Sequence, residues 1–547
     1  MERIWYNWYD SKVPRSIDYP GKPVKDYFRE WAEKQPEKPY LIYNDLVITY
    51  QQANSMARKL ANSLIELGVK KGDRVAIMTI NIPQYVIALQ ACFKAGFIVV
   101  PANPLYTPKE LTHQFNDSGA ENVFVMSFFA DKIHQIMDSG ATSLKRAIII
   151  QNPVALIDIK SAPNIYDFDA LIASGQDSEP WVDIYPDDIA LLQYTGGTTG
   201  PSKGCILSNR NLEAIGLQTV NWFNNLFPDW DFRNLGAIPF HHIYGFNTNI
   251  NMNSIAGGTI IIVDIPTPDN LLKNINQHSP NFFTAVPAMI YGLNQHPDIS
   301  TSQIKSIKGM ICGSAPLAVE VMKHFEELSG ATITEGYGMS ESSNVLTCTP
   351  IFTKRIPGSV GLPWPDMDIR IVDLETGNHD LPPGEPGELI ARGPTIMQGY
   401  WNNPQETANT IRNGWLYTGD IATMDEEGYI KIIDRKKDMI ICSGFNVYPR
   451  DIDEVMYGHP KVLDACTIGI PDPRRGESVK VYLVLKPGES MTEDEVKKHC
   501  RESLAPYKVP TYVEFINELP RTPVGKPMRT ALRAMEKAKA RGEDFRA

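Results

Sequence analysis

Short apolar runs alternate with amphipathic helical patterns through the first 150 residues of the chain. The clearest runs are residues 74–78, 97–101, 123–126 and 147–150. This alternation predicts a parallel α/β sheet from about residue 24 to residue 150. The same rhythm resumes at Ile189 and continues through the apolar runs 258–263 and 309–313, so we expect a second doubly wound α/β layer.

The pattern changes twice after residue 358. From there to residue 434 the strands shorten and Pro/Gly turns multiply, which predicts a small β-barrel-like or antiparallel region. The charged run Asp-Arg-Lys-Lys-Asp at residues 434–438 then separates two apolar segments, and such a run is usually a solvated turn. We place a domain boundary here, with a large N-terminal domain at residues 1–433 and a small, mobile C-terminal domain at residues 434–547.

The C-terminal domain has the pattern of a small α+β unit. A helix from about Pro449 precedes apolar strands at residues 465–470 and 479–485. Thr492 and Glu495 have the spacing of a capping box, so another helix is expected to begin there, ahead of a last strand near Tyr512.

Length and composition narrow the class of protein. A chain of 547 residues is too long for one compact core, so two or more domains are expected. Hydrophobic residues make up 43% and charged residues 21%, the balance of an ordinary globular protein. The net charge of −11 argues against broad nucleic-acid binding, although local basic clusters can still serve a phosphate ligand.

Cysteine usage and the N-terminal sequence bear on location. The seven cysteines are scattered and form no Cys-x-x-Cys pair, which favours reduced thiols in a cytoplasmic protein. The N-terminus lacks the apolar segment of a signal peptide, and the longest apolar stretch, residues 85–101, is broken by Lys94, so no transmembrane helix is expected. An N-terminal aromatic cluster leaves peripheral membrane contact open, but a packed anchor is favoured. Its members are Trp5, Tyr6, Trp8 and Tyr9.

Residues 194–204 combine glycines, hydroxyls and one cation directly behind the apolar run 189–193, which predicts a buried strand. Glycine backbones can turn N–H groups toward an anion, hydroxyls add donors, and Lys203 adds a mobile charge. The Walker spacing of a P-loop is absent. We expect this loop to join the strand to a helix that begins near Ser208 and to hold a polyphosphate, with a flexible polar linker as the weaker alternative. The candidate phosphate-binding residues are Thr195, Gly196, Gly197, Thr198, Thr199, Gly200, Ser202 and Lys203.

Five further segments contain unusual polar residues at positions where secondary-structure propensity alone would not place them. They occupy residues 238–245, 313–316, 335–341, 415–420 and 520–526. Together with the loop 194–204 they follow the order of motifs in adenylate-forming enzymes. Over nearly its whole length the chain resembles that superfamily of acyl-CoA synthetases, peptide-synthetase adenylation domains and beetle luciferases. The run 432–449 is most similar to bacterial and archaeal medium- to long-chain fatty acyl-CoA synthetases.

The resemblance implies a binding site for ATP. Tyr337 matches the residue whose ring faces adenine, Glu341 the Mg²⁺ ligand, and Asp420 the residue that accepts both ribose hydroxyls. Taken singly, such residues are more often a core tyrosine, a surface glutamate and an ordinary turn. The other positions implied at the nucleotide are Gly313, Ser314, Ala315, Glu335, Gly336, Gly338, Ser340, Ile432 and Arg435.

The resemblance also implies where the acid binds. His242 matches the residue at the gate between the acyl site and the thiol tunnel, although a buried, satisfied histidine is a serious alternative. Gly245 and Gly313 are expected to leave room for an acyl chain.

Two separate parts of the C-terminal domain match functional positions of the family. Lys526 matches the lysine that bridges the carboxylate and the α-phosphate during adenylation. Gly444 and Phe445 match the face that lines the pantetheine tunnel during thioester formation. One rigid pose would struggle to serve both steps, so the resemblance implies a rotation about a hinge at Lys437.

The activity implied is that of an ATP-dependent acyl-CoA synthetase. A carboxylate and ATP give acyl-AMP and pyrophosphate, and the thiol of coenzyme A then displaces AMP. ATP, Mg²⁺ and coenzyme A are the implied cofactors and co-substrates, and a medium- or long-chain fatty acid is the expected acid. The chain length, the shape of the acid and the oligomeric state stay open, with a homodimer among the options.

Three alternatives to this activity are less consistent with the sequence. An acyl-AMP ligase that loads a carrier protein is disfavoured, because the spacing from Glu341 to Asp420 leaves little room for the insertion typical of such enzymes. A luciferase is disfavoured because the chain does not end in a peroxisomal address. A nucleotide-binding homologue without catalysis is disfavoured because Glu341 and Lys526 are both present.

Overall fold

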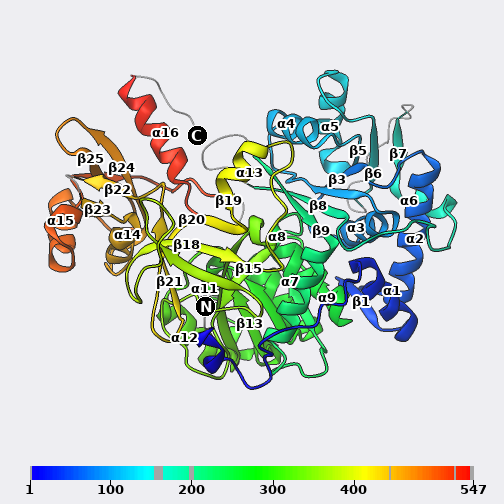
Figure 1. Ribbon diagram of the computed structural model, residues 1–547, viewed down its shortest axis with the longest axis horizontal. Coiled ribbons are helices and arrows are strands. Elements are labelled where there is room, and N and C mark those ends of the chain that lie inside the picture. The colour runs from blue at the N-terminus through cyan, green and yellow to red at the C-terminus, as the bar shows by residue number, and fades with distance from the viewer. Residues whose placement is uncertain (1–2, 153–163, 196–201, 443–444, 523–524, 542–547) are drawn as a thin grey trace. The chain divides into compact units, whose positions relative to one another are not determined.

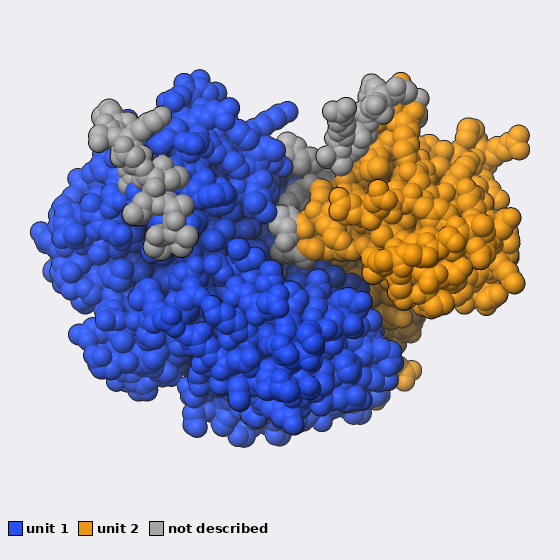
Figure 2. Space-filling model, turned by 180° about the vertical axis from the view of Figure 1, so that it is seen from behind, with its two compact units in different colours: residues 1–368, 391–416 blue, residues 369–390, 417–547 orange. Residues whose placement is uncertain are grey.

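The computed structural model describes residues 3–152, 164–195, 202–442, 445–522 and 525–541 (Figure 1). The chain forms two compact units, which Figure 2 colours separately: residues 1–368 with 391–416, and residues 369–390 with 417–547. The compact units do not divide at the predicted domain boundary, because residues 417–433 belong to the second unit. The functional boundary at residue 434 stays a prediction.

The first unit contains a seven-stranded sheet with the order β7-β6-β5-β3-β4-β8-β9. Its strands are β3 (Arg74–Met78), β4 (Ile98–Pro101), β5 (Asn122–Met126), β6 (Arg146–Ile150), β7 (Ile165–Asp167), β8 (Ile189–Tyr194) and β9 (Gly204–Ser208). All neighbours are parallel except β8 and β9. Helices of this region are α2 (Tyr50–Glu66), α3 (Pro83–Ala95), α4 (Pro108–Ser118), α5 (Ala130–Asp138) and α6 (Phe168–Ser174). Strands such as β5 are buried at every position, as expected for a parallel sheet that helices cover on both faces.

A nine-stranded sheet forms the second layer, with the order β16-β15-β14-β13-β12-β10-β11-β1-β2. Its strands are β1 (Pro39–Tyr43), β2 (Leu46–Thr49), β10 (Arg233–Gly236), β11 (Thr259–Ile262), β12 (Phe282–Ala285), β13 (Gly309–Cys312), β14 (Thr332–Met339), β15 (Asn344–Cys348) and β16 (Leu362–Pro363). The run from β14 to β1 is parallel. Its helices are α1 (Val24–Lys34), α7 (Asn209–Trp222), α8 (Ile243–Gly245), the π-helical segment η3 (Phe246–Asn251), α9 (Met252–Ala256), α10 (Pro268–His278), α11 (Pro287–Asn294) and α12 (Val319–Ser329). The two predicted α/β layers are therefore confirmed.

One local prediction is wrong. The strand β8 is not joined directly to a helix: it pairs with an antiparallel strand that follows the loop, and Tyr194 lies opposite Gly204. The apolar residues directly after the loop form β9, and only then does α7 begin, capped by the side chain of Ser208. The loop still lies at the carboxyl end of β8, which is the end where ligands collect in α/β sheets.

The second unit contains two smaller sheets. One comprises β17 (Asp368–Val372), β18 (Gly387–Arg392), β19 (Ile411–Arg412), β20 (Trp415–Met424) and β21 (Ile430–Arg435). All of β19, one end each of β17, β18 and β20, and the helix α13 (Pro404–Thr410) belong to the first unit. The other comprises β22 (Ile440–Cys442), β23 (Phe445–Val447), β24 (Val462–Asp472), β25 (Gly476–Leu485) and β26 (Tyr512–Phe515). It packs with α14 (Pro449–Tyr457), α15 (Glu493–Ser503) and α16 (Arg529–Ala540). Thr492 and Glu495 form the predicted capping box at the start of α15. The predicted α+β character of this region is confirmed.

The N-terminal aromatic residues pack inside the first unit. Trp5 and Tyr9 are buried, and the Tyr9 ring meets that of Trp222 edge-on at 5.3 Å between centroids. The buried carboxylate of Asp10 accepts backbone N–H bonds from residues 351–353. These contacts agree with the packed anchor that we favoured. Within the described part of the chain no helix is both long and apolar enough to span a bilayer.

Candidate active site

The hairpin between β8 and β9 carries the predicted phosphate loop. At its base the Thr195 N–H donates to the Lys203 carbonyl at 3.0 Å. The Tyr194 hydroxyl donates to Asp117 at the end of α4 at 2.6 Å, which ties the hairpin to this helix. Of the predicted residues, Gly196, Gly197, Thr198, Thr199 and Gly200 lie outside the described part of the chain, as does Gly444.

Lys203 has two partners that the sequence did not indicate. Its ammonium forms an ion pair with Glu406 on α13, and it lies 5.0 Å from the centre of the Tyr400 ring. The segment that carries Tyr400 runs beside β9: the Trp401 N–H donates to the Gly204 carbonyl at 2.8 Å. The contact depends on this pairing between positions about 200 residues apart, so no local motif could reveal it.

Glu341 lies in the short turn η6 (Ser340–Ser342), directly after β14. The Tyr400 hydroxyl donates to its Oε1 at 2.7 Å, and the Met397 N–H donates to its carbonyl at 2.9 Å. Tyr400 therefore contacts both Lys203 and Glu341, two residues that we predicted separately. The described residues hold no cluster of three or more metal-ligating side chains. A single half-buried carboxylate suits a Mg²⁺ ion whose other ligands are phosphate oxygens and water.

The predicted adenine site lies where β13 and β14 end side by side. Cys312 pairs with Glu335, so the turn at residues 313–315 follows β13 beside the continuing strand β14. The Glu335 carboxylate accepts the Leu317 N–H at 3.3 Å and thus holds this turn against β14. Ser314 has φ of +70°, a backbone that a non-glycine residue rarely adopts. Tyr337 is half-buried and Gly338 exposed, on the part of β14 that pairs with β15.

His242 caps the short helix α8. Its Nδ1 accepts the Tyr244 N–H at 3.2 Å, so a neutral ring carries its proton on Nε2. Burial lowers the pKa of His242 to about 4 and that of His241 to about 3, with repulsion by His242 adding to the second shift. Both rings are therefore neutral near pH 7. The Tyr244 hydroxyl lies 2.9 Å from the Ile311 carbonyl, which links α8 to the end of β13.

Gly245 and Gly313 differ in what surrounds them. A Cβ at Gly245 would lie 2.2 Å from the Pro239 carbonyl oxygen, so the glycine allows α8 to approach the backbone closely. We expected Gly245 to leave room for an acyl chain, but the close approach of the Pro239 carbonyl explains the glycine without a ligand. A Cβ at Gly313 would make ordinary contacts of 3.4 Å with the Tyr244 ring and the Gly336 carbonyl.

Alanine at these two positions should have different effects. Gly245→Ala is expected to lower the free energy of unfolding by about 2–3 kcal/mol, because backbone atoms must move. Gly313→Ala should fold normally and change only the relative kcat/KM for acids of different size. Thermal denaturation of both variants, with kcat/KM for a short and a long acid, measures the two effects. Equal destabilisation would contradict this distinction.

In the second unit, Asp420 on β20 faces Arg435 on β21. The two residues are direct partners in the antiparallel pair, and Arg435 Nε lies 3.0 Å from Asp420 Oδ1. Asp420 is only 4% exposed, so its carboxylate is oriented by protein groups. Ile432 pairs with Ala422 on the same two strands. These three predicted nucleotide residues are thereby brought together.

Lys526 ends a tight loop in the same unit. The Thr522 N–H donates to the Lys526 carbonyl at 2.8 Å, and the Lys526 N–H donates to the Thr522 hydroxyl at 3.1 Å. Gly525 has φ of +80°, which explains why a glycine precedes the lysine. Desolvation and repulsion by Arg435 lower the pKa of Lys526, while attraction to Asp420 opposes the shift. The Lys526 ammonium therefore loses its proton more readily than that of an ordinary lysine.

The predicted hinge is a turn that follows β21. The N–H groups of Asp438 and Met439 both donate to the Arg435 carbonyl, and Lys437 projects to solvent between Asp434 and Asp438. Partial desolvation of its ammonium, with repulsion by Arg435, lowers the pKa of Lys437.

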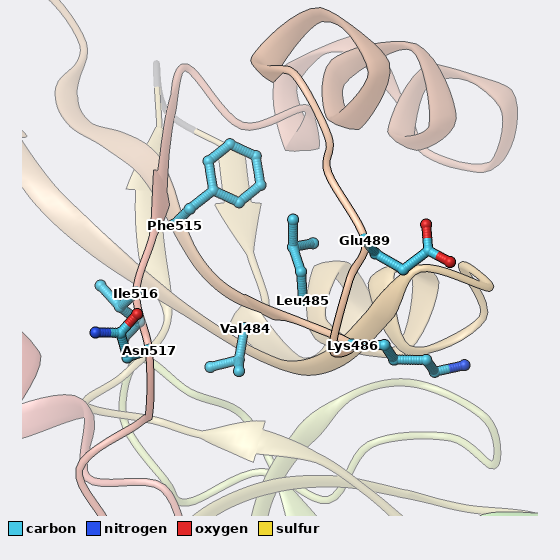
Figure 3. A pocket seen from close by; sticks show the side chains of 7 residues that line it. All are labelled: Val484, Leu485, Lys486, Glu489, Phe515, Ile516 and Asn517. Carbon is cyan, nitrogen blue, oxygen red and sulfur yellow. The ribbon is translucent and has the colours of Figure 1, made fainter.

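Phe445 begins β23 and is 53% exposed. Its ring stacks on Tyr507 with centroids 4.5 Å apart and an angle of 14° between the planes. The half-buried Tyr507 ring supports the exposed Phe445 ring, and an exposed, supported ring of this kind suits contact with a ligand, the role predicted for the thiol tunnel. A separate shallow hollow of about 300 Å³ lies between the ends of β25 and β26 (Figure 3). It is lined by Val484, Leu485, Lys486, Glu489, Phe515, Ile516 and Asn517, none of which is a predicted site residue.

Comparison with known proteins assigns the chain to a family. The model of the AMP-binding enzymes matches residues 28–401, and the model of the AMP-binding enzyme C-terminal domain matches residues 451–526. The chain therefore belongs to the AMP-binding enzyme family, whose members form adenylates from ATP. The resemblance inferred from the ordered motifs is confirmed.

Relatives and solved structures agree over almost the full length. A long-chain-fatty-acid–CoA ligase of Bacillus subtilis (strain 168) is 37% identical over 97% of this chain and 98% of its own. One of Yersinia pestis is 37% identical over 98% of each chain. ATP-bound MatB from Rhodopseudomonas palustris has a TM-score of 0.85 at 28% identity and covers 94% of this chain and 99% of its own. This agreement confirms the predicted fold class.

Proposed function

We propose that the protein is an ATP-dependent acyl-CoA synthetase that acts on medium- or long-chain fatty acids. The observation that carries the proposal is the match to long-chain-fatty-acid–CoA ligases over 97% of the chain. The arrangement of Lys203, Glu341 and His242 in the first unit, and of Asp420 and Lys526 in the second, supports it. An acid–thiol ligase of this class needs ATP, a carboxylic acid and coenzyme A.

In the first half-reaction the carboxylate attacks the α-phosphorus of ATP, and pyrophosphate leaves. Lys203 and the loop 195–203 bind the β- and γ-phosphates, and Lys526 offsets the negative charges that the carboxylate and the α-phosphate bring together. The Nε2–H of His242 donates to the carboxylate and orients it. Glu341 would hold Mg²⁺, which supplies positive charge at the phosphates.

In the second half-reaction the thiol of coenzyme A attacks the acyl carbonyl of the adenylate. The C–S bond forms, the C–O bond to AMP breaks, and AMP leaves. The stacked rings of Phe445 and Tyr507 provide an apolar face for the pantetheine arm. Because Lys526 and Phe445 lie on the same C-terminal domain and serve different steps, this domain rotates about the hinge at Lys437 between the two half-reactions, and the domains divide functionally at residue 434.

A panel of acids from acetate to long-chain and cyclic acids tests this function. Pyrophosphate release and acyl-CoA formation should both occur, with the highest kcat/KM for medium- or long-chain acids. Adenylate without thioester would point to a ligase that loads a carrier protein. ATP binding without turnover would point to a silent homologue.

We also propose a cytoplasmic location, since all seven cysteines are buried free thiols, as in a reducing compartment. Fractionation of cells that express the protein would test it. Recovery in the membrane fraction would favour peripheral membrane contact.

A further inference from the structure

Tyr400 has no role in the function proposed so far, yet its side chain contacts two residues to which we assign the phosphates and the metal. We propose that Tyr400 is a positioning residue that holds Lys203 and Glu341 in register for MgATP. The inference rests on the proposed function, because the roles of Lys203 and Glu341 belong to it. The inference adds Tyr400, a residue that acts through both Lys203 and Glu341.

The backbone of Tyr400 is fixed to the strand that carries the phosphate loop. The Ile206 N–H donates to the Gly399 carbonyl at 2.9 Å, and the Trp401 N–H donates to the Gly204 carbonyl at 2.8 Å. Tyr400 thus lies directly opposite Cys205, two residues after Lys203. Its own N–H donates to the Thr407 hydroxyl of α13 at 2.9 Å. The position of the ring is therefore coupled to the position of the loop.

The side chain of Tyr400 offers a different surface to each partner. Its ring lies 5.0 Å from the Lys203 ammonium, within the range of a cation–π contact. Its hydroxyl donates to Glu341 Oε1 at 2.7 Å. A tyrosine hydroxyl is protonated near neutral pH, so it acts as the donor in this bond. A hydrogen bond to one carboxylate oxygen restricts the rotation of Glu341 and directs its other oxygen.

Glu406 completes the arrangement. Its carboxylate forms an ion pair with Lys203, whose hydrogen bond lowers the pKa of Glu406. Glu406 lies on α13, which begins at the side-chain cap of Asn403 just after Tyr400. The ion pair keeps the ammonium beside the ring, and phosphate oxygens compete with Glu406 for the same charge. The Lys203 ammonium can therefore bind either Glu406 or a phosphate while it stays beside the Tyr400 ring.

Two substitutions separate the contacts of Tyr400. Tyr400→Phe keeps the ring beside Lys203 and removes the hydrogen bond to Glu341. The Mg²⁺ concentration for half-maximal pyrophosphate release should rise about tenfold, the effect of losing a hydrogen bond to a charged group. Tyr400→Leu removes the ring as well, and the KM for ATP should rise a further threefold or so. Thioester formation from supplied acyl-AMP should not change in either variant.

A double-mutant cycle tests whether Tyr400 acts through Glu341. Glu341→Gln alone should raise the Mg²⁺ requirement, and adding Tyr400→Phe should then have little further effect. If Glu341→Gln leaves the Mg²⁺ requirement unchanged, the proposed role of Glu341 is wrong, and Tyr400 has no metal ligand to position. If Glu341→Gln raises it but the two effects simply multiply, only the inference about Tyr400 is overturned.

Tyr43→Phe is the matched control. The Tyr43 hydroxyl also donates to a carboxylate, that of Asp264, at 2.9 Å and from β1 of the same unit. This variant should lose a comparable hydrogen bond without any change in Mg²⁺ dependence. A similar rise in the Mg²⁺ requirement in Tyr43→Phe would mean that loosening of the fold, and not positioning, explains the result.

Discussion

Replacement of Lys526 by alanine is expected to slow adenylation by about 100- to 1000-fold, the loss seen when one group that stabilises transition-state charge is removed. Thioester formation from supplied acyl-AMP should stay within about twofold, because the proposed role of Lys526 is confined to the first half-reaction. Pyrophosphate release and acyl-AMP consumption, measured separately on the same preparation, give the two rates.

The physical reason is the charge that the C-terminal unit gathers around this residue. Lys526 is electrostatically coupled to Asp420 and Arg435, which lie about 100 residues earlier in the chain. Since its pKa is lowered, its charge is lost at a lower pH than for an ordinary lysine. Adenylation should therefore decline on the alkaline side in the wild type, and Lys526→Arg, which stays charged, should not show that decline.

Lys498→Ala is a suitable control, because Lys498 is an exposed lysine on α15 of the same unit. It should leave both half-reactions unchanged. Equal loss of both rates in Lys526→Ala would contradict the assignment of separate roles to Lys526 and Phe445.

The sequence predicted best those features that depend on neighbouring residues. The buried strand β8, the helix start at Ser208 and the capping box of Thr492 each follow from a few adjacent side chains, and all three are present. The hairpin partner β9 was missed because five residues after a glycine-rich loop suit either the end of a loop or a short strand.

The candidate site was predicted in part, for a related reason. Ordered motifs pointed to Lys203 and Glu341 one at a time, but nothing local to either indicates a shared neighbour. Tyr400 reaches both only because the residues around it pair with β9. Likewise the sequence alone allows Gly245 to be interpreted as space for a ligand, whereas the structure places the Pro239 carbonyl beside it. Long-range packing decides these cases, and a single sequence does not encode it in a readable pattern.

Replacement of Arg529 by leucine is expected to lower the free energy of unfolding of the C-terminal unit by about 3–5 kcal/mol, the usual effect of removing one partner from a buried ionic network. Arg529 begins α16 and donates to Asp453 at 2.7 Å and to Asp434 at 3.3 Å. Asp434 and Asp453 are 5% and 6% exposed. Without the guanidinium these carboxylates would remain buried with too little positive charge, and the segment of the predicted hinge turn would lose one of its links to α16.

Hydrogen exchange of the β24 and β25 amides is the appropriate measurement. All nine tryptophans lie in the first unit, so their fluorescence would report on the wrong part of the molecule. Peptides from β12 provide an internal reference. Arg501→Leu, at an exposed arginine on α15, provides the matched control.

The pH dependence of the Arg529→Leu effect tests its electrostatic origin. Burial raises the pKa of Asp453 to about 6 even beside Arg529. A carboxyl whose pKa is higher in the folded than in the unfolded state favours folding when it is protonated, and the variant should raise this pKa further. The deficit of Arg529→Leu should therefore shrink as the pH falls through about 6, and Asp453→Asn should recover part of it at pH 7. A deficit that does not depend on pH would indicate lost packing in place of unpaired charge.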